Sequence, residues 1–334
     1  MIQKITMEEY LKDLREKESK MDESPYVETL FGRTANSLKK ITKDKIVIRT
    51  DYDADGITSA YIMAKSLETI YPGKEVEVRV NDRRGAYAAL PDDKDDSVCY
   101  IIMDMGTNAL DLIEQNYGDD CFIIDHHLAN DNIVKQHFLA KAKENERWLN
   151  LHLECGETAP DYCTAGLAYR LFLELYDGKN DKLRNTLTAM AAIGTVADCV
   201  NLMDENSLNR LIVKEGINAI NDATKDNFDE QIGYILASIC PSIDGANGVD
   251  VTATDIRMSI APFINAAGRM SGTWGTNGSQ VMYDLLCKDN NLAYRSLESL
   301  AVLKKAVANK VQNDDAYISF LQECKNKTGV QVYF

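Results

Sequence analysis

The stretch IVIRTDYDADG, residues 46–56, joins a short apolar run to three aspartates at alternate positions, Asp51, Asp53 and Asp55. Alternate side chains of an extended chain face the same side, so these carboxylates are expected to gather at the end of a strand. Such a cluster repels itself, and a folded chain tolerates it best when cations neutralise it. The stretch therefore predicts a strand that ends in a cation site.

The segments around this stretch alternate between strand and helix patterns. Residues 56–70 have apolar side chains at helical spacing, whereas residues 75–80 alternate with period two. Residues 98–103 and 121–124 are short apolar runs typical of buried strands. Strands that alternate with helices predict an α/β fold with a mainly parallel, doubly wound sheet. In such a sheet, ligands bind at the carboxyl ends of the strands.

Acidic residues and histidines stand at two further strand ends. Asp104 follows the apolar run at residues 98–103, and Asp125, His126 and His127 follow the run at 121–124. The chain has only four histidines, and two of them are adjacent here. Carboxylates and imidazoles that meet at strand ends form a centre that suits Mn²⁺ or Mg²⁺. We therefore expect metal-assisted hydrolysis.

The spacing of the aspartates has two other interpretations. The spacing also matches the opening of a calcium-binding EF-hand loop, but such a loop needs a helix before it and a glutamate at position twelve. Position twelve is Ile62, and strand formers precede the loop, so the EF-hand is disfavoured. The aspartates could instead simply cap a turn and the helix that follows. The remaining histidines, His137 and His152, are interpreted as surface or structural residues.

The composition is that of an ordinary soluble protein. The 334 residues are 45% hydrophobic and 27% charged. A net charge of −15 disfavours broad attraction to nucleic acid, although a metal centre supplies positive charge locally. No apolar run approaches the roughly 18 residues that a membrane span needs, and the N-terminus lacks the apolar core of a signal peptide. Eight cysteines without a CxxC pair, Cys199 among them, are expected to be buried thiols, and we expect a cytoplasmic protein.

Three regions are predicted along the chain. Residues 1–44 form an N-terminal helical extension, residues 45–225 the catalytic domain, and residues 226–334 a helical linker and a C-terminal region. Helices are expected from residue 164 to about 221, with the segment 194–198 breaking an otherwise apolar helix.

Several arginines are candidate phosphate contacts. Arg269 follows the small residues at 266–268, which would let the backbone approach a ligand closely, and its guanidinium could grip a phosphate. The alternative for Arg269 is an interdomain salt bridge. Arg83 and Arg84, beside Gly85, form a second candidate contact.

Taken together, these residues resemble the DHH phosphoesterase superfamily, and within it the RecJ single-strand exonucleases. The resemblance extends from about residue 45 to 309, and the segment 261–270 is similar to the RecJ segment that helps to build the DNA channel. The four motifs that carry it are Asp51-Tyr52-Asp53-Ala54-Asp55-Gly56, Asp104-Met105-Gly106, Asp125-His126-His127 and Gly194-Thr195-Val196-Ala197-Asp198.

The resemblance implies a role for each site residue. Asp104 would bridge two metal ions, Mn²⁺ or alternatively Mg²⁺, and a water between the ions would attack the phosphorus. His127 would contact the scissile phosphate or the leaving oxygen, and Asp125 would orient a histidine ring. Arg269 and Asn265 would hold a neighbouring phosphate. The implied metal ligands are Asp51, Asp53, Asp55, Asp104, His126 and Asp198.

One departure leaves the substrate open. RecJ-like enzymes carry a second, DHH-associated domain with a Gly-Gly-His motif, which this sequence lacks; residues 328–334 could be its first strand, cut short. The expected function is a RecJ-like exonuclease on single-stranded DNA, with a role in DNA repair, in a reduced or phage-type form or one completed by a protein partner. The alternatives are a DHH hydrolase of short oligonucleotides, cyclic dinucleotides or pyrophosphate, and a catalytically silent scaffold that binds single strands or replication proteins.

Overall fold

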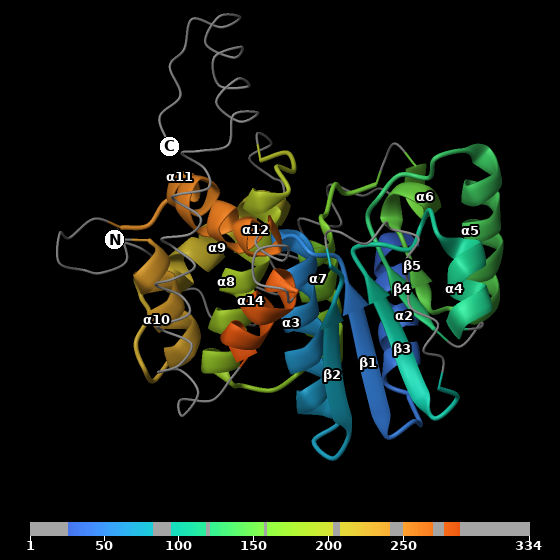
Figure 1. Cartoon of the computed structure of the whole chain (residues 1–334), viewed down its shortest axis with the longest axis horizontal. Coiled ribbons are helices and arrows are strands. Elements are labelled where there is room, and N and C mark those ends of the chain that lie inside the picture. The colour runs from blue at the N-terminus through green and yellow to red at the C-terminus, as the bar shows by residue number, and fades with distance from the viewer. Residues whose placement is uncertain are drawn as a thin grey trace, which may run out of the picture.

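The computed structural model describes residues 26–82, 95–117, 121–156, 159–202, 208–240, 250–269 and 277–287. The expectations for Arg83, Arg84 and the two ends of the chain lie outside these residues. The described strands form one parallel sheet in the order β2-β1-β3-β4-β5 (Figure 1). They are β1 (Lys45–Thr50), β2 (Glu75–Val80), β3 (Val98–Met103), β4 (Phe122–Ile124) and β5 (Trp148–Leu149).

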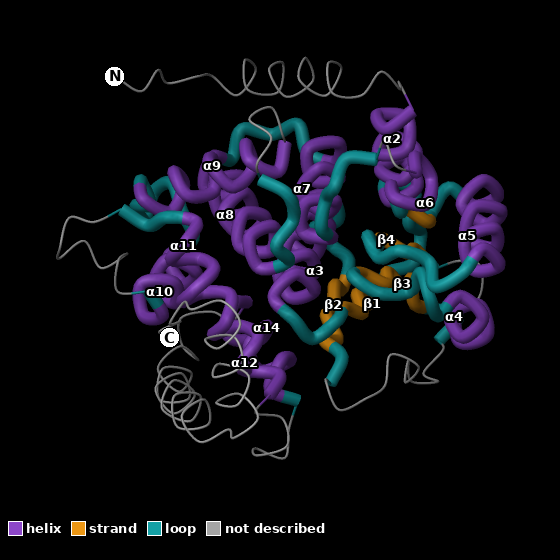
Figure 2. Tube along the Cα trace, turned by 90° about the horizontal axis from the view of Figure 1, so that it is seen from above, coloured by secondary structure: helices purple, strands orange, loops and turns teal. Residues whose placement is uncertain are grey.

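Helices cover both faces of this sheet, which confirms the doubly wound prediction. Ile46 and Ile48 of β1 pack into one core, whereas Val47 between them packs into the other. Figure 2 shows the two groups of helices on either side of the strands. One group contains α2 (Tyr26–Leu38), α3 (Ala54–Ile70) and α7 (Thr164–Leu175), and the other contains α4 (Leu110–Tyr117) and α5 (Asn132–Asn145).

The strand register brings the predicted site residues to one edge of the sheet. Thr50, the last residue of β1, pairs with Met103 of β3, which in turn pairs with Ile124 of β4. The next residue of each strand therefore leaves the sheet at the same level. In addition, β1 lies between β2 and β3, where the strand order reverses, and ligands bind at such a switch point.

The second half of the described chain is helical, as predicted. One expectation was wrong, because the segment 194–198 does not break its helix: α8 continues through Gly194 to Ala197. The large core includes Val27, Ile212 and Leu286, one from each region expected from the sequence, and the boundaries of those regions stay a prediction. The remaining elements are α6 (Leu151–Cys155), α8 (Asp181–Ala197), α9 (Leu208–Asn221), α10 (Glu230–Ile239), α11 (Ala253–Asp255), a π-helix (Ile256–Ile260), α12 (Ala261–Arg269) and α14 (Gly278–Cys287).

Side chains near the start of α14 bind the outer edge of β2. Gln280 accepts a hydrogen bond from Val80 N at 2.8 Å and donates one to the carbonyl of Val78 at 3.1 Å. Asn277 donates to the carbonyl of Val80 at 2.6 Å. These bonds fix the C-terminal helices of the described chain to the sheet.

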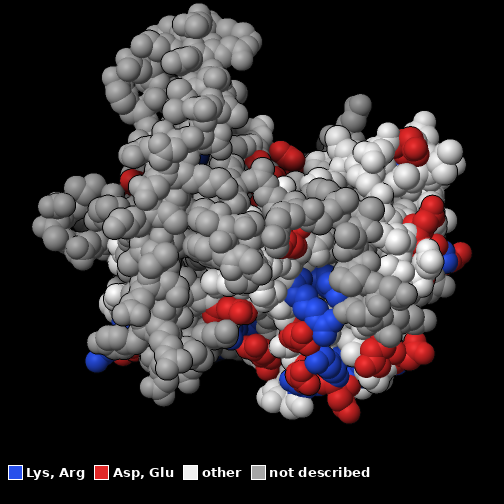
Figure 3. Space-filling model, viewed as in Figure 1, with Lys and Arg blue, Asp and Glu red and all other residues white. Residues whose placement is uncertain are grey.

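Lysine and arginine side chains gather over β1 and β2, beside acidic ones (Figure 3). Lys45 contacts Glu75 and Glu77, each at 2.7 Å, and Arg79 contacts Glu77 at 2.6 Å. Both cations are therefore neutralised within the strands and do not offer a free basic groove. None of the helices in the described ranges is long and apolar enough to cross a membrane.

Candidate metal centre

The six expected metal ligands converge at the carboxyl end of the sheet. They come from the loop after β1, from the first turn of α3, from the residues that follow β3 and β4, and from the end of α8. Within each of three groups, one nitrogen or oxygen atom per residue lies within 4.8 Å of the others. Because Asp104 and His126 each belong to two groups, the groups form one continuous cluster. The groups are Asp51, Asp53 and Asp104; Asp55, His126 and Asp198; and Asp104, His126 and His127.

His126 lies between three of the carboxylates. Its Nε2 is 3.5 Å from Asp104 Oδ1 and 3.9 Å from Asp55 Oδ2. Its Nδ1 is 3.8 Å from Asp198 Oδ2. A single imidazole thus connects ligands that are 143 residues apart in the sequence, from Asp55 to Asp198.

The N-terminus of α7 fixes Asp55. The buried carboxylate accepts hydrogen bonds from the backbone N–H groups of Thr164 and Ala165, both at 2.8 Å. These N–H groups have no partner within the helix, and the N-cap residue Cys163 makes no side-chain bond to them. Asp55 therefore caps α7 from a different element, where the helix dipole also favours a negative charge. The hydroxyl of Thr164 donates to Asp104 at 2.9 Å, so α7 orients two ligands.

Asp104 has a strained backbone at the centre of the cluster. Its φ of 57° lies in the left-handed region, which non-glycine residues rarely adopt. Its N–H nevertheless donates to the carbonyl of Ile124 at 3.0 Å, which continues the ladder between β3 and β4. Strain of this kind is concentrated at functional sites, where the surrounding structure maintains it.

The electrostatics of the cluster fit a divalent cation. Burial, together with the charge of Asp55, raises the pKa of Asp104 well above its usual value. Burial also raises the pKa of Asp55 and of Asp198 to about 6. Within the described part of the chain, neither Asp55 nor Asp104 pairs with a lysine or arginine. Oxygen-rich ligands with one imidazole suit Mn²⁺ or Mg²⁺, and such an ion would neutralise the crowded carboxylates.

Asp125 is enclosed by hydrogen-bond donors. It accepts bonds from the backbone of Thr107, His126 and His127 and, at 2.7 Å, interacts with Nδ1 of the His127 ring. Burial alone would raise the pKa of Asp125, but the bonds from His127 and Thr107 outweigh it and hold that pKa below its usual value. The hydrogen bond between Asp125 and the His127 ring also raises the pKa of His127 to about 9. Asp125 thus contacts a histidine ring, and its expected role in orienting that ring stays a prediction.

Gly194 lets α8 approach this centre closely. A Cβ atom at this position would lie 2.4 Å from the Cβ of Ala165, 2.5 Å from Thr58 Oγ1 and 2.9 Å from Asp55 Oδ1. A larger residue would therefore push α8, and Asp198 at its end, away from the other ligands. The sequence pattern pointed to Gly194, but the physical reason is close packing and not a break in the helix.

The expected phosphate contacts are only partly described. Asn265 lies on α12, and its Oδ1 accepts a hydrogen bond from Ala54 N at 2.7 Å, next to the aspartates. Arg269 ends α12, but its side chain lies outside the described residues, as do Arg83 and Arg84. Their roles stay predictions.

Four other residues singled out in the sequence are Asp53, His137, His152 and Cys199. Asp53 does cap α3, through Gly56 N at 3.1 Å, so capping and metal binding are compatible uses of this aspartate. His137 and His152 lie outside the cluster, as predicted. The expectation that Cys199 is buried was wrong, because the turn after α8 leaves its side chain exposed.

Sequence reasoning missed two supporting residues. Thr164 contacts both Asp55 and Asp104, and the buried Asn150 donates to the carbonyl of His127 at 2.8 Å. Neither residue belongs to a motif. Neither could be recognised from the sequence, because threonine and asparagine are common at helix starts for local capping alone. These contacts depend on distant segments and become visible only in three dimensions.

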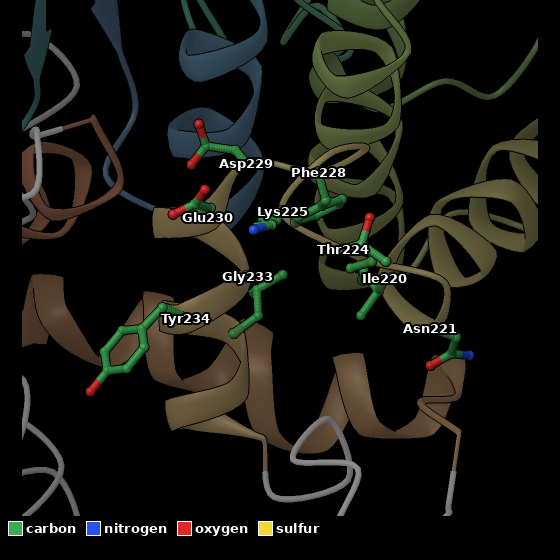
Figure 4. Close-up of a pocket in the computed structure, with 11 residues that line it drawn as sticks. Ile220, Asn221, Thr224, Lys225, Phe228, Asp229, Glu230, Gly233 and Tyr234 are labelled. Atoms are coloured by element: carbon green, nitrogen blue, oxygen red, sulfur yellow. The ribbon is translucent and has the colours of Figure 1, made fainter.

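Two further features lie apart from the metal centre. Asp111, Glu114 and His137, on α4 and α5, form another acidic group whose ligand atoms lie within 4.8 Å of one another. A cavity of 310 Å³ lies between α9 and α10, lined in part by Lys225 and Tyr234 (Figure 4). No residue of the metal centre lines this cavity.

Comparison with known proteins identifies the domain. Residues 45–195 match the DHH family, N-terminal domain. The single-stranded-DNA-specific exonuclease RecJ of Bacillus subtilis is 27% identical over 236 residues, which are 68% of this chain and 27% of that protein. YorK of Bacillus phage SPbeta, whose name describes a candidate single-strand DNA-specific exonuclease, is 23% identical over 258 residues, or 76% of this chain and 40% of that protein. The chain thus spans less than half the length of these relatives.

The fold comparison agrees. A crystal structure of exonuclease RecJ bound to manganese matches with a TM-score of 0.65 at 22% identity, over 89% of this chain and 69% of that one. Residues 45–195 therefore form a DHH domain, and RecJ exonucleases are homologues of this chain.

Proposed function

We propose that this DHH-domain protein is a divalent-metal-dependent phosphodiesterase that hydrolyses single-stranded DNA as a RecJ-like exonuclease. The observation that carries the proposal is the continuous cluster of carboxylates around His126, in which the buried Asp55 and Asp104 pair with no lysine or arginine among the described residues. Burying such a cluster costs free energy unless a cation neutralises the carboxylates.

Two metal ions are proposed, with Mn²⁺ preferred and Mg²⁺ as the alternative. Asp51 and Asp53 would hold one ion; Asp55, His126 and Asp198 would hold the other. Asp104 would bridge them; this role is supported by its place in one group with Asp51 and Asp53 and by its distance of 3.5 Å from His126. When bound, such a pair of ions would activate a water near neutral pH and stabilise the charge that develops on a phosphate.

His127 and Asp125 are proposed to act on the substrate side of the reaction. Since the pKa of His127 is raised to about 9, both of its ring nitrogens would carry a proton at neutral pH. Asp125 holds Nδ1, which leaves Nε2 to donate to a phosphate oxygen or to the leaving oxygen. The chain would thus supply a positioned acid beside the ions.

The choice of single-stranded DNA is supported by the RecJ relatives, which are named for that substrate. Arg269, Arg83 and Arg84 are proposed as contacts to substrate phosphates, on the basis of the sequence alone. The chain's own substrate, and any partner that completes it, remain part of the proposal.

The proposal is tested by measuring hydrolysis of single-stranded DNA labelled at either end, with chelator, Mn²⁺ or Mg²⁺ present. We expect cleavage only with metal, and loss of cleavage in Asp104→Ala with the fold retained by circular dichroism. Asp111→Ala, a surface aspartate of the other acidic group, is the matched control and should remain active.

Parallel assays with a dinucleotide, a cyclic dinucleotide and pyrophosphate separate the alternatives. Cleavage of one of these in place of the strand would replace the exonuclease with a small-substrate hydrolase. Binding of single strands without cleavage, unaffected by chelator, would indicate a silent scaffold. Full activity in Asp104→Ala would contradict the bridging role.

A further inference from the structure

The aspartate loop, residues 51–55, is held by two side chains from the far end of the described chain. Asn265 on α12 accepts a hydrogen bond from the N–H of Ala54 at 2.7 Å. Ser279 on α14 donates from its hydroxyl to the carbonyl of Tyr52 at 2.8 Å. Tyr52 and Ala54 are the two residues that separate the three aspartates, so each intervening residue has a partner in the C-terminal helices.

Both bonds satisfy backbone groups that α3 does not satisfy itself. Ala54 is the first residue of α3, and the N–H groups of a first helical turn have no acceptor within the helix. The cap residue Asp53 bonds to Gly56 N and leaves the N–H of Ala54 to Asn265. Because the backbone on either side of Asp53 is fixed, the directions of the neighbouring carboxylates are fixed as well.

Gly268 provides the room for the second bond. A Cβ atom at this position would lie 2.6 Å from the hydroxyl oxygen of Ser279, which is fully buried, and 3.6 Å from the ring of Tyr52. The small residues before Arg269 were expected to allow close approach of a ligand. At Gly268, the described close approach is that of Ser279 and the aspartate loop.

We propose that Asn265 and Ser279 are positioning residues that set the cation affinity of the metal centre by holding the aspartate loop. Three like charges within five residues repel one another, so the loop would relax outward without an external restraint. Residues that orient metal ligands from behind typically change metal affinity as well as geometry. The inference rests on the proposed function only in requiring that the loop binds metal ions.

The test compares Asn265 on α12 and Ser279 on α14 with Gln280, the neighbour of Ser279. Ser279→Ala and Asn265→Ala remove one bond each to the aspartate loop, whereas Gln280→Ala removes two bonds from the same helix to the edge of β2. Affinity for Mn²⁺ is measured by calorimetry on the whole chain without nucleic acid, and thermal unfolding is measured in chelator. We expect Mn²⁺ binding to weaken about tenfold in the first two variants. Gln280→Ala should lower the melting temperature but keep the Mn²⁺ affinity of the unaltered chain.

Gly268→Ala gives an independent check. Helix propensity alone predicts a small gain in stability for this change, but displacement of the Ser279 hydroxyl predicts weaker Mn²⁺ binding. Combining Gly268→Ala with Ser279→Ala should weaken Mn²⁺ binding no further than Ser279→Ala does, because both changes remove the same bond.

Each other outcome overturns the inference in a recognisable way. Equal Mn²⁺ affinity in Ser279→Ala and Gln280→Ala would show that the hydroxyl has no role in the centre beyond docking. A raised KM for DNA with unchanged Mn²⁺ affinity in Asn265→Ala would make Asn265 a substrate contact instead. Absence of Mn²⁺ binding by the unaltered chain would overturn the metal centre itself, and this inference with it.

Discussion

Among the described residues, acidic side chains gather within 4.8 Å of one another in two places, the metal centre and the surface group of Asp111, Glu114 and His137, and the surroundings of these two groups differ. Asp104 in the first group is only 2% exposed and, within the described ranges, pairs with His126 but with no lysine or arginine. In the second group the side chain of Asp111 is 98% exposed, and Lys141 lies 3.5 Å from Glu114. Because burial makes unneutralised carboxylates costly, we expect the first group, and not the second, to bind a metal ion.

The largest expected effect separates the two groups through their histidines. His126→Ala should lower metal-dependent hydrolysis at least about 100-fold, because the ring lies between three ligands of the centre. His137→Ala, in the surface group, is the matched control and should stay within about twofold of the unaltered rate. Initial rates over a range of Mn²⁺ concentrations measure both. Similar losses in the two variants would remove the distinction between the groups.

A smaller effect is expected on stability, when the packing of the helices around the metal centre is disturbed. Gly194→Ala should lower the free energy of unfolding by about 1–3 kcal/mol, because its methyl group would overlap Ala165 and Thr58. Gly32→Ala, in α2, adds a methyl group to open space and should be neutral or stabilising by up to about 1 kcal/mol. Urea unfolding of both variants in chelator provides the comparison. An unchanged stability in Gly194→Ala would mean that the helices can separate at little cost.

The pH dependence of stability gives an effect of a few degrees. Burial raises the pKa of Asp55 and of Asp198 to about 6 in the folded state, so the folded protein binds protons more tightly than the unfolded chain does. Their contribution to stability is complete below the unfolded value near 4 and is lost as the pH rises through about 6. Without metal, the melting temperature should therefore fall by a few degrees from pH 5.5 to 7.5.

Added Mn²⁺ should act in the opposite sense. Cations compete with protons for the same carboxylates, so stabilisation by Mn²⁺ should be larger at pH 7.5 than at pH 5.5. Differential scanning fluorimetry at the two pH values, with chelator or Mn²⁺, measures both slopes. Equal Mn²⁺ stabilisation at both values would place the cation elsewhere.

The smallest effect is expected in the surface group. Glu114→Gln removes its ion pairs with His137 and Lys141, which are partly exposed, and should change the free energy of unfolding by no more than about 1 kcal/mol. Mn²⁺ affinity should not change. A measurable loss of Mn²⁺ binding in this variant would reveal a second cation site and weaken the contrast.

The sheet and the convergence of the expected ligands were predictable because their signals are local. Strands β1, β3 and β4 each contain an apolar run and end directly before an aspartate, and parallel pairing brings those ends to one level. β5 was missed, because two residues are too few for a pattern. The fold class and the convergence of the expected ligands therefore follow from short-range sequence features.

The supports of the centre were not predictable in the same way. Thr164, Asn265 and Ser279 reach the aspartates across more than 100 residues of sequence. Threonine, serine and asparagine side chains also form many local hydrogen bonds with the backbone. The surrounding sequence therefore does not indicate which distant backbone group such a side chain will contact. The role of Gly194 was misread for a similar reason, because the groups that exclude a side chain there belong to other helices.

Gln280 lies on α14, and its side-chain amide forms hydrogen bonds with β2, the strand at one edge of the sheet. It makes the two bonds, to Val78 and Val80, that an adjoining peptide would make. Unpaired groups at a strand edge can recruit the edge of another copy, which is a common route to aggregation. The helix that contacts the aspartate loop through Ser279 thus also covers the outward groups of β2 at Val78 and Val80, the end of the strand nearest the metal centre.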